Sequence, residues 1–321
     1  MKLVAVDLGG THARFALAEA EGGRVVHLGE PVTLRAGDYP GLAQAWQAFA
    51  EGLGEPVPRA AAIALAAPVG AGPIQLTNNS WIIDPARLDG ELGVDRHILV
   101  NDFAAVAHAV AQVGDAYFEH LAGPEGPLPE RGTVTVLGPG TGLGVAHLWR
   151  DGEAYRVQAT EGGHIDFAPV DAFEDALLAR LRARHRRVSV ERVVAGPALA
   201  TIYMTLAAQS GAAVVPLDDK ALWTAALSGA DGLAGAALDR FCRSLGSVAG
   251  DLALAQGASA VVIAGGLGLR LAQVLPHSQF GARFVAKGRF EALMASLPVK
   301  LIVHPQPGLY GAAAAFAQEA R

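Results

Sequence analysis

An amide and a carboxylate stand side by side at Asn101 and Asp102, between a β-rich run at residues 97–100 and an Ala-rich helical run at 104–112. Open α/β sheets bind ligands outside the carboxyl ends of their strands, so substrate chemistry is expected at such a junction. Asp102 is a candidate general base that takes a proton from a substrate hydroxyl. The alternative is that Asp102 only caps the helix, because Asp is a preferred N-cap residue.

Two glycine-rich turns, each between apolar strands and each with a threonine, lie within residues 3–17 and 133–149. Glycines permit a positive φ and let a ligand approach backbone N–H groups, which suits an anion such as phosphate. Asp7, at the end of the first strand, would suit a hydrated Mg²⁺. The first turn could also be an ordinary hairpin, but the repeated pattern predicts a duplicated core. The residues expected to bind are Gly9, Gly10 and Thr11 in the first turn and Gly140, Thr141 and Gly142 in the second.

Neither turn fits the common dinucleotide or P-loop motifs. The glycines of the second turn are spaced by two and precede a strand, which disfavours a Rossmann fingerprint, and no Gly-Lys-Ser/Thr occurs in the chain. A third glycine-rich turn, at Gly265 and Gly266, follows a buried run at 260–264. It would suit close packing against a purine or ribose, where a side chain would obstruct.

Glu161 and His164 flank a pair of glycines. Such a pair can hold vicinal hydroxyls of a sugar, since Glu accepts hydrogen bonds and His donates or accepts them. A lone His is more often structural, and no second His stands at a metal-ligand spacing. Glu191 is either a third sugar contact or an acid favoured in the first turn of a helix, for which Ser189 is the expected cap.

The elements that must position these residues alternate between strands and helices. Apolar runs predict strands at residues 3–6, 15–18, 25–34, 60–66, 97–100, 133–137, 145–149, 260–264 and 299–303. Periodic or Ala-rich patterns predict helices at 41–53, 104–112, 173–187, 198–256 with two breaks, and 308–319. The last helix is expected to pack on the N-terminal half, because chain ends often lie close together. Residues 114–132 are expected to be a connector, and Asn78 lies in a loop-rich amide and hydroxyl cluster at 76–81 that lines a ligand cleft or satisfies turns.

Composition narrows the class of protein. A chain of 321 residues with 51% hydrophobic and 17% charged residues predicts a compact globular protein of about two domains. The net charge of −6 argues against a nucleic-acid-binding surface. Cys242 is the single cysteine, so a disulfide within the chain and a Cys-based zinc site are excluded, and a reducing compartment such as the cytoplasm is expected. No signal peptide precedes the first predicted strand, and no membrane span is expected from the apolar runs.

Taken in order, these motifs resemble the bacterial glucokinase family, within the hexokinase–actin–Hsp70-like superfamily. The matching segments are residues 7–14, 76–81, 101–103, 140–146, 161–169, 191–197, 263–266, 287–290 and 308–314. The resemblance implies an α/β fold of the duplicated ribonuclease H-like (actin-like ATPase) type. It implies a small α/β domain at 1–108 plus 305–321 and a larger α+β domain at 109–304, with a sugar and nucleotide cleft between them.

The resemblance also implies an activity: ATP-dependent phosphorylation of glucose at its 6-hydroxyl, a step of glycolysis, by a cytoplasmic homodimer. Asp102 would be the base, Asp7 would hold Mg²⁺ through water, and Gly265 and Gly266 would hold the adenosine. The glycine-rich turns would hold the phosphates of ATP. The sugar would be bound by Asn78, Asn101, Asp102, Glu161, His164 and Glu191. One departure is His12, where the family usually has Asn, so the role of that side chain stays open.

Three other functions are compatible with parts of the pattern. A kinase for another hexose or an amino sugar would keep the same site residues. A sugar-sensing regulator is disfavoured, because the first predicted strand begins at Leu3 and leaves no room for an N-terminal DNA-binding domain. Regulators and kinases with a Cys-rich zinc motif are disfavoured because no Cys lies near His164. An actin-like filament or chaperone ATPase would have no need of Glu161, His164 and Glu191.

Overall fold

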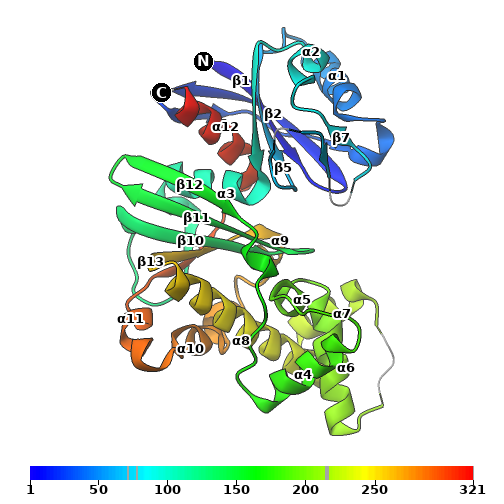
Figure 1. Ribbon diagram of the computed structural model, residues 1–321, viewed down its shortest axis with the longest axis vertical. Coiled ribbons are helices and arrows are strands. Elements are labelled where there is room, and N and C mark those ends of the chain that lie inside the picture. The colour runs from blue at the N-terminus through cyan, green and yellow to red at the C-terminus, as the bar shows by residue number, and fades with distance from the viewer. Residues whose placement is uncertain (71, 77–78, 214–216, 321) are drawn as a thin grey trace. The chain divides into compact units, whose positions relative to one another are not determined.

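The computed structural model describes residues 1–70, 72–76, 79–213 and 217–320. Within it the chain forms two compact units (Figure 1). The first consists of Met1–Gly114, Val157–Ala159 and His304–Arg321, and the second of Asp115–Arg156 and Thr160–Val303. Both are mixed α/β structures, so the predicted α/β class is confirmed at this level. The domain boundary expected at residue 108 falls inside a helix that runs to Gln112.

The first unit is built on a six-stranded sheet with the order β3-β2-β1-β5-β8, to which β4 adds by pairing with β2. The strands β1 and β2 form an antiparallel hairpin, whereas β1, β5 and β8 run parallel. The carboxyl ends of these parallel strands therefore meet at one edge of the sheet. The bounds are β1 (Lys2–Leu8), β2 (His12–Glu21), β3 (Arg24–Leu28), β4 (Val32–Arg35), β5 (Ala60–Leu65) and β8 (Arg96–Asn101), with a separate pair β6 (Ile74–Gln75) and β7 (Ile82–Ile83).

Helices cover both faces of this sheet, which explains why β1 is an almost unbroken apolar run. One face carries Val4, Val6 and Leu8 and packs against Trp46 and Phe49 of a helix. The other carries alternate residues of β1 and packs against the C-terminal helix. The helices are α1 (Leu42–Gly52), α2 (Leu88–Leu92), α3 (Asp102–Gln112) and α12 (Pro307–Glu319), with a 3₁₀ turn η1 (Ala36–Asp38).

The C-terminal helix α12 is part of the first unit (Figure 1, red). It packs against α3, and a Cβ at Gly311 would overlap the backbone oxygen of Ala105 on that helix. Leu309 and Phe316 of α12 are buried against the sheet. Small residues at this crossing therefore let the two helix backbones approach closely.

The second unit contains a sheet with the order β12-β11-β10-β13-β14-β9. The strands β10 and β11 form an antiparallel hairpin, β10, β13 and β14 run parallel, and β9 closes the sheet antiparallel to β14. From β12 to β14 this order repeats that of the first sheet from β3 to β8. The bounds are β9 (Phe118–Ala122), β10 (Arg131–Pro139), β11 (Leu143–Asp151), β12 (Ala154–Thr160), β13 (Ala258–Ile263) and β14 (Val299–Ile302).

The long helix α8 (Gly232–Ala255) is the centre of the helical part of the second unit. It lies against α10 so closely that a Cβ at Gly246 would overlap the Phe280 backbone oxygen (Figure 1, yellow and orange). The other helices are α4 (Ala172–Arg182), α5 (Glu191–Val194), α6 (Ala198–Ser210), α7 (Asp219–Ser228), α9 (Gly265–Arg270), α10 (Phe280–Val285) and α11 (Glu291–Ala295). Short 3₁₀ turns are η2 (Asp115–Tyr117), η3 (Gly162–His164), η4 (Leu275–His277) and η5 (Gly288–Phe290).

Three local expectations are wrong. The stretch 114–132 is not only a connector, because it contributes the edge strand β9 to the second sheet. Ser189 does not cap α5, whose N-cap position is Val190 with no side-chain cap. The segment after β13 is not a turn, since α9 begins directly at Gly265.

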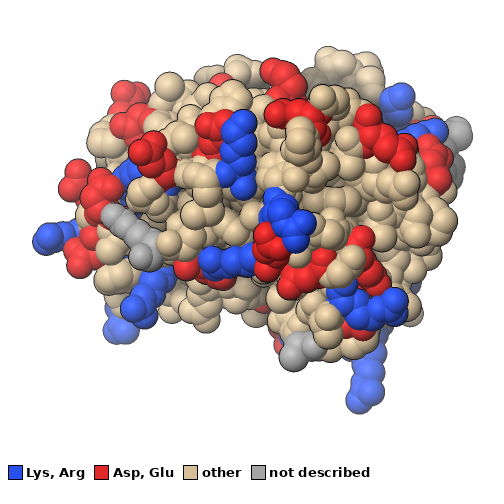
Figure 2. All heavy atoms as spheres, turned by 90° about the horizontal axis from the view of Figure 1, so that it is seen from above, with Lys and Arg blue, Asp and Glu red and all other residues tan. Residues whose placement is uncertain are grey.

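Charges of both signs are interspersed on the face of the molecule shown in Figure 2. Among the residues that the structure describes, no helix is both long and apolar enough to cross a membrane.

Candidate active site

Asn101, not Asp102, caps helix α3. The Asn101 side-chain oxygen accepts hydrogen bonds from the backbone N–H groups of Phe103 at 3.0 Å and Ala104 at 3.1 Å. Its amide nitrogen donates to the backbone oxygen of Ala67 at 3.4 Å. The alternative interpretation of Asp102 as the N-cap is therefore wrong by one residue, and Asp102 is instead the first residue of the helix.

Asp102 is partly buried at this helix start. Its Oδ1 accepts the Phe103 N–H at 2.8 Å. The positive end of the α3 dipole favours a negative charge at this position. Because Asn101 fixes the first turn, the carboxylate is held on a rigid element rather than on a loop.

The first glycine-rich turn is a tight hairpin between β1 and β2, closed by a hydrogen bond from Gly9 N–H to the His12 oxygen at 3.0 Å. Neither Gly9 nor Gly10 has a φ in the left-handed region, so the expected use of a positive φ is wrong here. A Cβ at Gly9 would make only an ordinary contact, 3.5 Å from the His12 oxygen. His12 itself begins β2. Gly9 and Gly10 are partly exposed, and Thr11 is exposed beside them.

Asp7 lies at the end of β1, opposite Arg14 of β2. The Arg14 Nη1 donates to Asp7 Oδ2 at 3.1 Å. Burial raises the pKa of Asp7, and the Arg14 guanidinium opposes that rise. The first turn of α12 lies against the same carboxylate, because a Cβ at Gly308 would be 2.9 Å from Asp7 Cγ. The Asp7 carboxylate is thus held between a guanidinium and the positive end of a helix.

The candidate residues of the first unit share one edge of its sheet. Leu8 of β1 pairs with Leu65 of β5, and Leu65 pairs with Asn101 of β8. With neighbouring strands about 4.8 Å apart, the first hairpin and the Asn101–Asp102 junction stand about 10 Å from each other. The structure therefore brings these two predicted sites together within the first unit.

The second glycine-rich turn is shorter than expected. The strands β10 and β11 extend to Pro139 and from Leu143, so only residues 140–142 form the turn. The Gly140 N–H donates to the Gly142 oxygen at 2.8 Å. Neither Gly140 nor Gly142 has a φ in the left-handed region, so that expectation is wrong here too. Gly142 is needed for another reason: a Cβ there would be 2.6 Å from the Glu191 Oε2.

Glu161, His164 and Glu191 belong to two segments that lie beside this turn. The N–H of Val190 donates to the Ile165 oxygen at 2.9 Å, so the two segments are hydrogen-bonded to each other. Glu161 and His164 are 59% and 57% exposed, with their nearest carboxylate and imidazole atoms 3.9 Å apart. The second unit therefore brings a carboxylate, an imidazole and a further carboxylate to the neighbourhood of the turn.

Gly265 also contacts the second hairpin. It has φ +81°, and a Cβ there would be 3.1 Å from the Pro139 oxygen. The preceding Ala264 N–H donates to the Leu137 oxygen at 2.8 Å. Here the backbone does use glycine's access to the left-handed region. Gly266 follows in the first turn of α9, and a Cβ there would meet open space.

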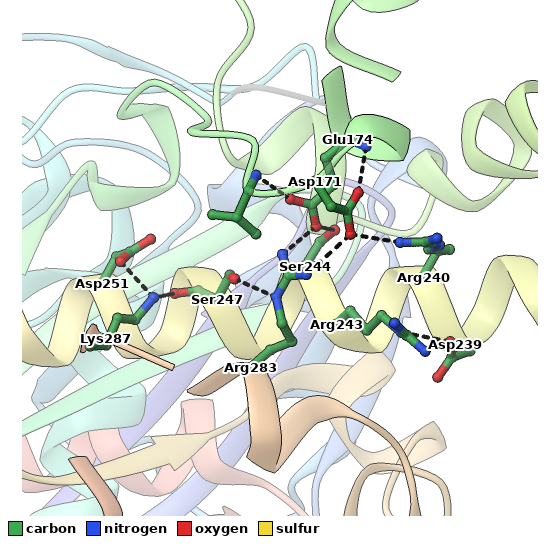
Figure 3. A network of polar contacts seen from close by, with 11 residues as sticks. Asp171, Glu174, Asp239, Arg240, Arg243, Ser244, Ser247, Asp251, Arg283 and Lys287 are labelled. Atoms are coloured by element: carbon green, nitrogen blue, oxygen red, sulfur yellow. Dashed lines mark hydrogen bonds and ion pairs between the residues drawn. The ribbon is translucent and has the colours of Figure 1, made fainter. Parts of the chain in front are cut away.

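A network of ion pairs holds the chain just beyond Glu161 and His164 (Figure 3). Asp171 caps α4 by accepting the Glu174 N–H at 2.9 Å. Glu174 is 1% exposed and receives Arg283 Nη2 at 2.7 Å and Ser244 Oγ at 3.1 Å. Arg240 and Arg283 both donate to Asp171 Oδ2, at 2.7 and 3.3 Å. The start of α4 is thereby fixed to α8 and α10.

Several contributing residues were not singled out from the sequence. Arg14 and Gly308 stand within segments that carry the family resemblance, but only the fold places them at Asp7. Gly163 and Gly196, which contact the second hairpin, are likewise recognisable only in three dimensions. Asn78 lies outside the described residues.

Comparisons with known proteins identify the family to which the chain belongs. A family model described as glucokinase matches residues 3–319. A glucokinase from Zymomonas mobilis is 58% identical over 99% of this chain and 98% of its own length. The crystal structure of a glucokinase from an Antarctic psychrotroph superposes with a TM-score of 0.86 at 34% identity, covering 98% of both chains. A glucokinase from Streptomyces griseus in complex with glucose and AMPPNP shares the fold, with a TM-score of 0.62 at 19% identity over 99% of this chain and 100% of that one.

The chain has two α/β units in which glycine turns and carboxylates lie at the ends of strands. This arrangement and the matches together define a sugar kinase. Within that class, the chain belongs to the glucokinase family.

Proposed function

We propose that this enzyme transfers the γ-phosphoryl group of ATP to the 6-hydroxyl of glucose, giving glucose 6-phosphate and ADP. The observation that carries the proposal is the Asn101–Asp102 junction, where a capped helix holds a carboxylate at the same sheet edge as a backbone-exposing glycine hairpin. The relative from Streptomyces griseus that was solved with glucose and AMPPNP supports this pair of substrates.

In the proposed reaction Asp102 accepts the proton of the sugar 6-hydroxyl as the oxygen attacks the γ-phosphorus. The bond from that phosphorus to the ADP oxygen breaks, and ADP leaves. Phosphoryl transfer depends mainly on positioning and charge stabilisation rather than on covalent chemistry by the protein. Asn101 positions the base and contacts the sugar, with Asn78 as a further contact, and Glu161, His164 and Glu191 hold sugar hydroxyls by hydrogen bonds.

The backbone N–H groups and threonines of the two hairpins are proposed to hold the phosphates of ATP, and Gly265 and Gly266 to pack against the adenosine. The donor set at Asp7 fits hydrated Mg²⁺, which usually takes one or two carboxylates and fills its other positions with water and phosphate oxygens. When bound, Mg²⁺ would neutralise charge on the phosphate chain. Asp7 would orient the hydrated ion through water, and Arg14 would hold the Asp7 carboxylate in place.

Three broader features are part of the same proposal. The repeated strand order of the two sheets supports a duplicated ribonuclease H-like fold of the actin-like ATPase type. The buried free thiol of Cys242 suits a cytoplasmic enzyme. A homodimer is proposed from the family resemblance, and light scattering on the purified protein would give its mass in solution.

The test is an initial-rate assay across a matrix of sugars and phosphoryl donors, with ADP formation coupled to a detectable signal. Glucose with ATP should give the highest kcat/KM, and Asp102→Asn should lower kcat by about 10²- to 10⁴-fold while the fold is retained. A near wild-type kcat in this variant would remove Asp102 from its role. A faster reaction with mannose or glucosamine would reassign the substrate, and ATP hydrolysis independent of any sugar would favour an ATPase of the filament or chaperone class.

A further inference from the structure

The tip of the second hairpin is held by the segments proposed to bind the sugar. The Leu143 N–H, at the start of β11, donates to Glu191 Oε2 at 2.9 Å. The Gly140 oxygen accepts the Gly196 N–H at 2.7 Å. On the other side, a Cβ at Gly163 would overlap the Leu143 oxygen. Both segments therefore contact the backbone at the tip of the hairpin, at Gly140 or Leu143.

The two oxygens of the Glu191 carboxylate differ in their contacts. Oε2 accepts the hydrogen bond from the Leu143 N–H of the hairpin, whereas Oε1 makes no hydrogen bond or ion pair with any residue that the structure describes. The side chain is partly exposed. One carboxylate can accept hydrogen bonds at both oxygens, so Glu191 can hold the hairpin and a sugar hydroxyl at the same time.

We infer that Glu191 is a positioning residue for the phosphate-binding hairpin, and that it couples sugar binding to nucleotide binding within the second unit. This inference rests on the proposed function. A sugar hydroxyl that fixes Oε1 also fixes Oε2, and with it the Leu143 N–H and the turn at residues 140–142. A hairpin already held in its binding conformation loses less freedom when the nucleotide binds, which makes the nucleotide bind more tightly.

Gly142 leaves room for the contact between Glu191 and the Leu143 N–H. A Cβ there would stand 2.6 Å from Glu191 Oε2, closer than a van der Waals contact allows, so either the carboxylate or the turn would have to move. By contrast, a Cβ at Gly140 would approach the Gly142 oxygen no closer than 4.0 Å. The absence of a side chain at residue 142 is therefore required by the link to Glu191 rather than by the turn conformation.

The experiment measures the affinity of the whole enzyme for AMPPNP by calorimetry, with and without saturating glucose. In the wild type, glucose should tighten AMPPNP binding by about 5-fold or more, the usual lower range of coupling between sites. Gly142→Ala and Glu191→Ala should bring this ratio close to 1. Glu191→Gln, which keeps an oxygen for Leu143, should retain part of it. Gly235→Ala, in open space on α8, is the control and should keep the wild-type ratio.

The outcomes separate the inference from the proposed function. If the wild type phosphorylates glucose but its ratio is 1, or if Gly142→Ala weakens AMPPNP equally with and without glucose, the coupling through Glu191 is refuted and the proposed function stands. If the wild type binds neither ligand, the proposed function itself fails. Thermal unfolding of each variant verifies that the ratio is measured on folded protein.

Discussion

Arg283 offers a sharp test of how the second unit is held together. Its guanidinium donates to Glu174 Oε1 at 2.7 Å and to Asp171 Oδ2 at 3.3 Å, and its Nε donates to Ser247 Oγ at 3.1 Å. Arg283 is 16% exposed and Glu174 only 1% exposed. The substitution Arg283→Met would keep most of the aliphatic volume and leave the Glu174 carboxylate buried without its cation (Figure 3).

The burial of the Arg283–Glu174 ion pair determines how much stability the substitution removes. Removing one partner of a buried ion pair lowers the free energy of unfolding by about 3–5 kcal/mol. For a folding unit of this size, each kcal/mol lowers Tm by about 2–4 °C, so the expected drop is about 6–20 °C. The matched control is Arg243→Met on α8, whose partner Asp239 lies one helical turn away and is 40% exposed. That pair contributes about 0–1 kcal/mol.

Scanning calorimetry on the intact chain gives both shifts. The double variant Arg283→Met with Glu174→Gln should recover part of the lost Tm, because it removes the unpaired charge together with its partner. Equal shifts for Arg283→Met and Arg243→Met would refute the reasoning, since burial would then not determine the cost. A double variant less stable than Arg283→Met alone would also contradict it.

Three further predictions concern single side chains. Gly246→Ala should lower the free energy of unfolding by about 3 kcal/mol in urea titrations, because its Cβ would overlap the Phe280 oxygen. Gly235→Ala in the same helix should raise the free energy of unfolding by about 0.5–1 kcal/mol. Equal effects of the two substitutions would contradict the packing argument. Asn101→Ala should lower the free energy of unfolding by about 1 kcal/mol and also lower kcat. Asn101→Asp should keep the cap and the free energy of unfolding. An unchanged free energy of unfolding in the Ala variant would show that the cap contributes nothing. Burial lowers the pKa of His108 to about 4 from its ordinary 6.5, so the unfolded chain binds more protons between these values and stability should fall by up to about 3 kcal/mol as the pH drops through this range. His108→Gln should reduce that acid sensitivity, and an identical pH profile for the variant would contradict it.

The long periodic elements were predictable from the sequence because one pattern dominates each of them. The helices at 42–52, 198–210, 219–228, 232–255 and 307–319 and the buried strands of both sheets are close to their expected positions. The strands β9 and β12 were missed because their side chains are largely exposed, so they lack the apolar runs of the central strands. Edge strands depend on pairing with a distant segment, which a local pattern does not encode.

The candidate site was predictable as a set of residue types, and less so as a set of contacts. The choice of N-cap between Asn101 and Asp102 depends on where the helix starts, and both residues are good caps. The need for glycine at residue 142 arises from Glu191, far along the chain, and not from the local backbone. The convergence of both hairpins on one nucleotide stays a prediction.

The placement of α12 in the first unit has a consequence for synthesis on the ribosome. The strands of the first sheet emerge first, but the helix that buries Leu3 and Ala5 on one face is translated last. Residues 115–303, which include all of the second unit, are joined to the chain before residue 307. The first unit therefore lacks the helix that covers this sheet face throughout the synthesis of the second unit. A nascent chain that stalls before its final helix would present that face to chaperones and proteases.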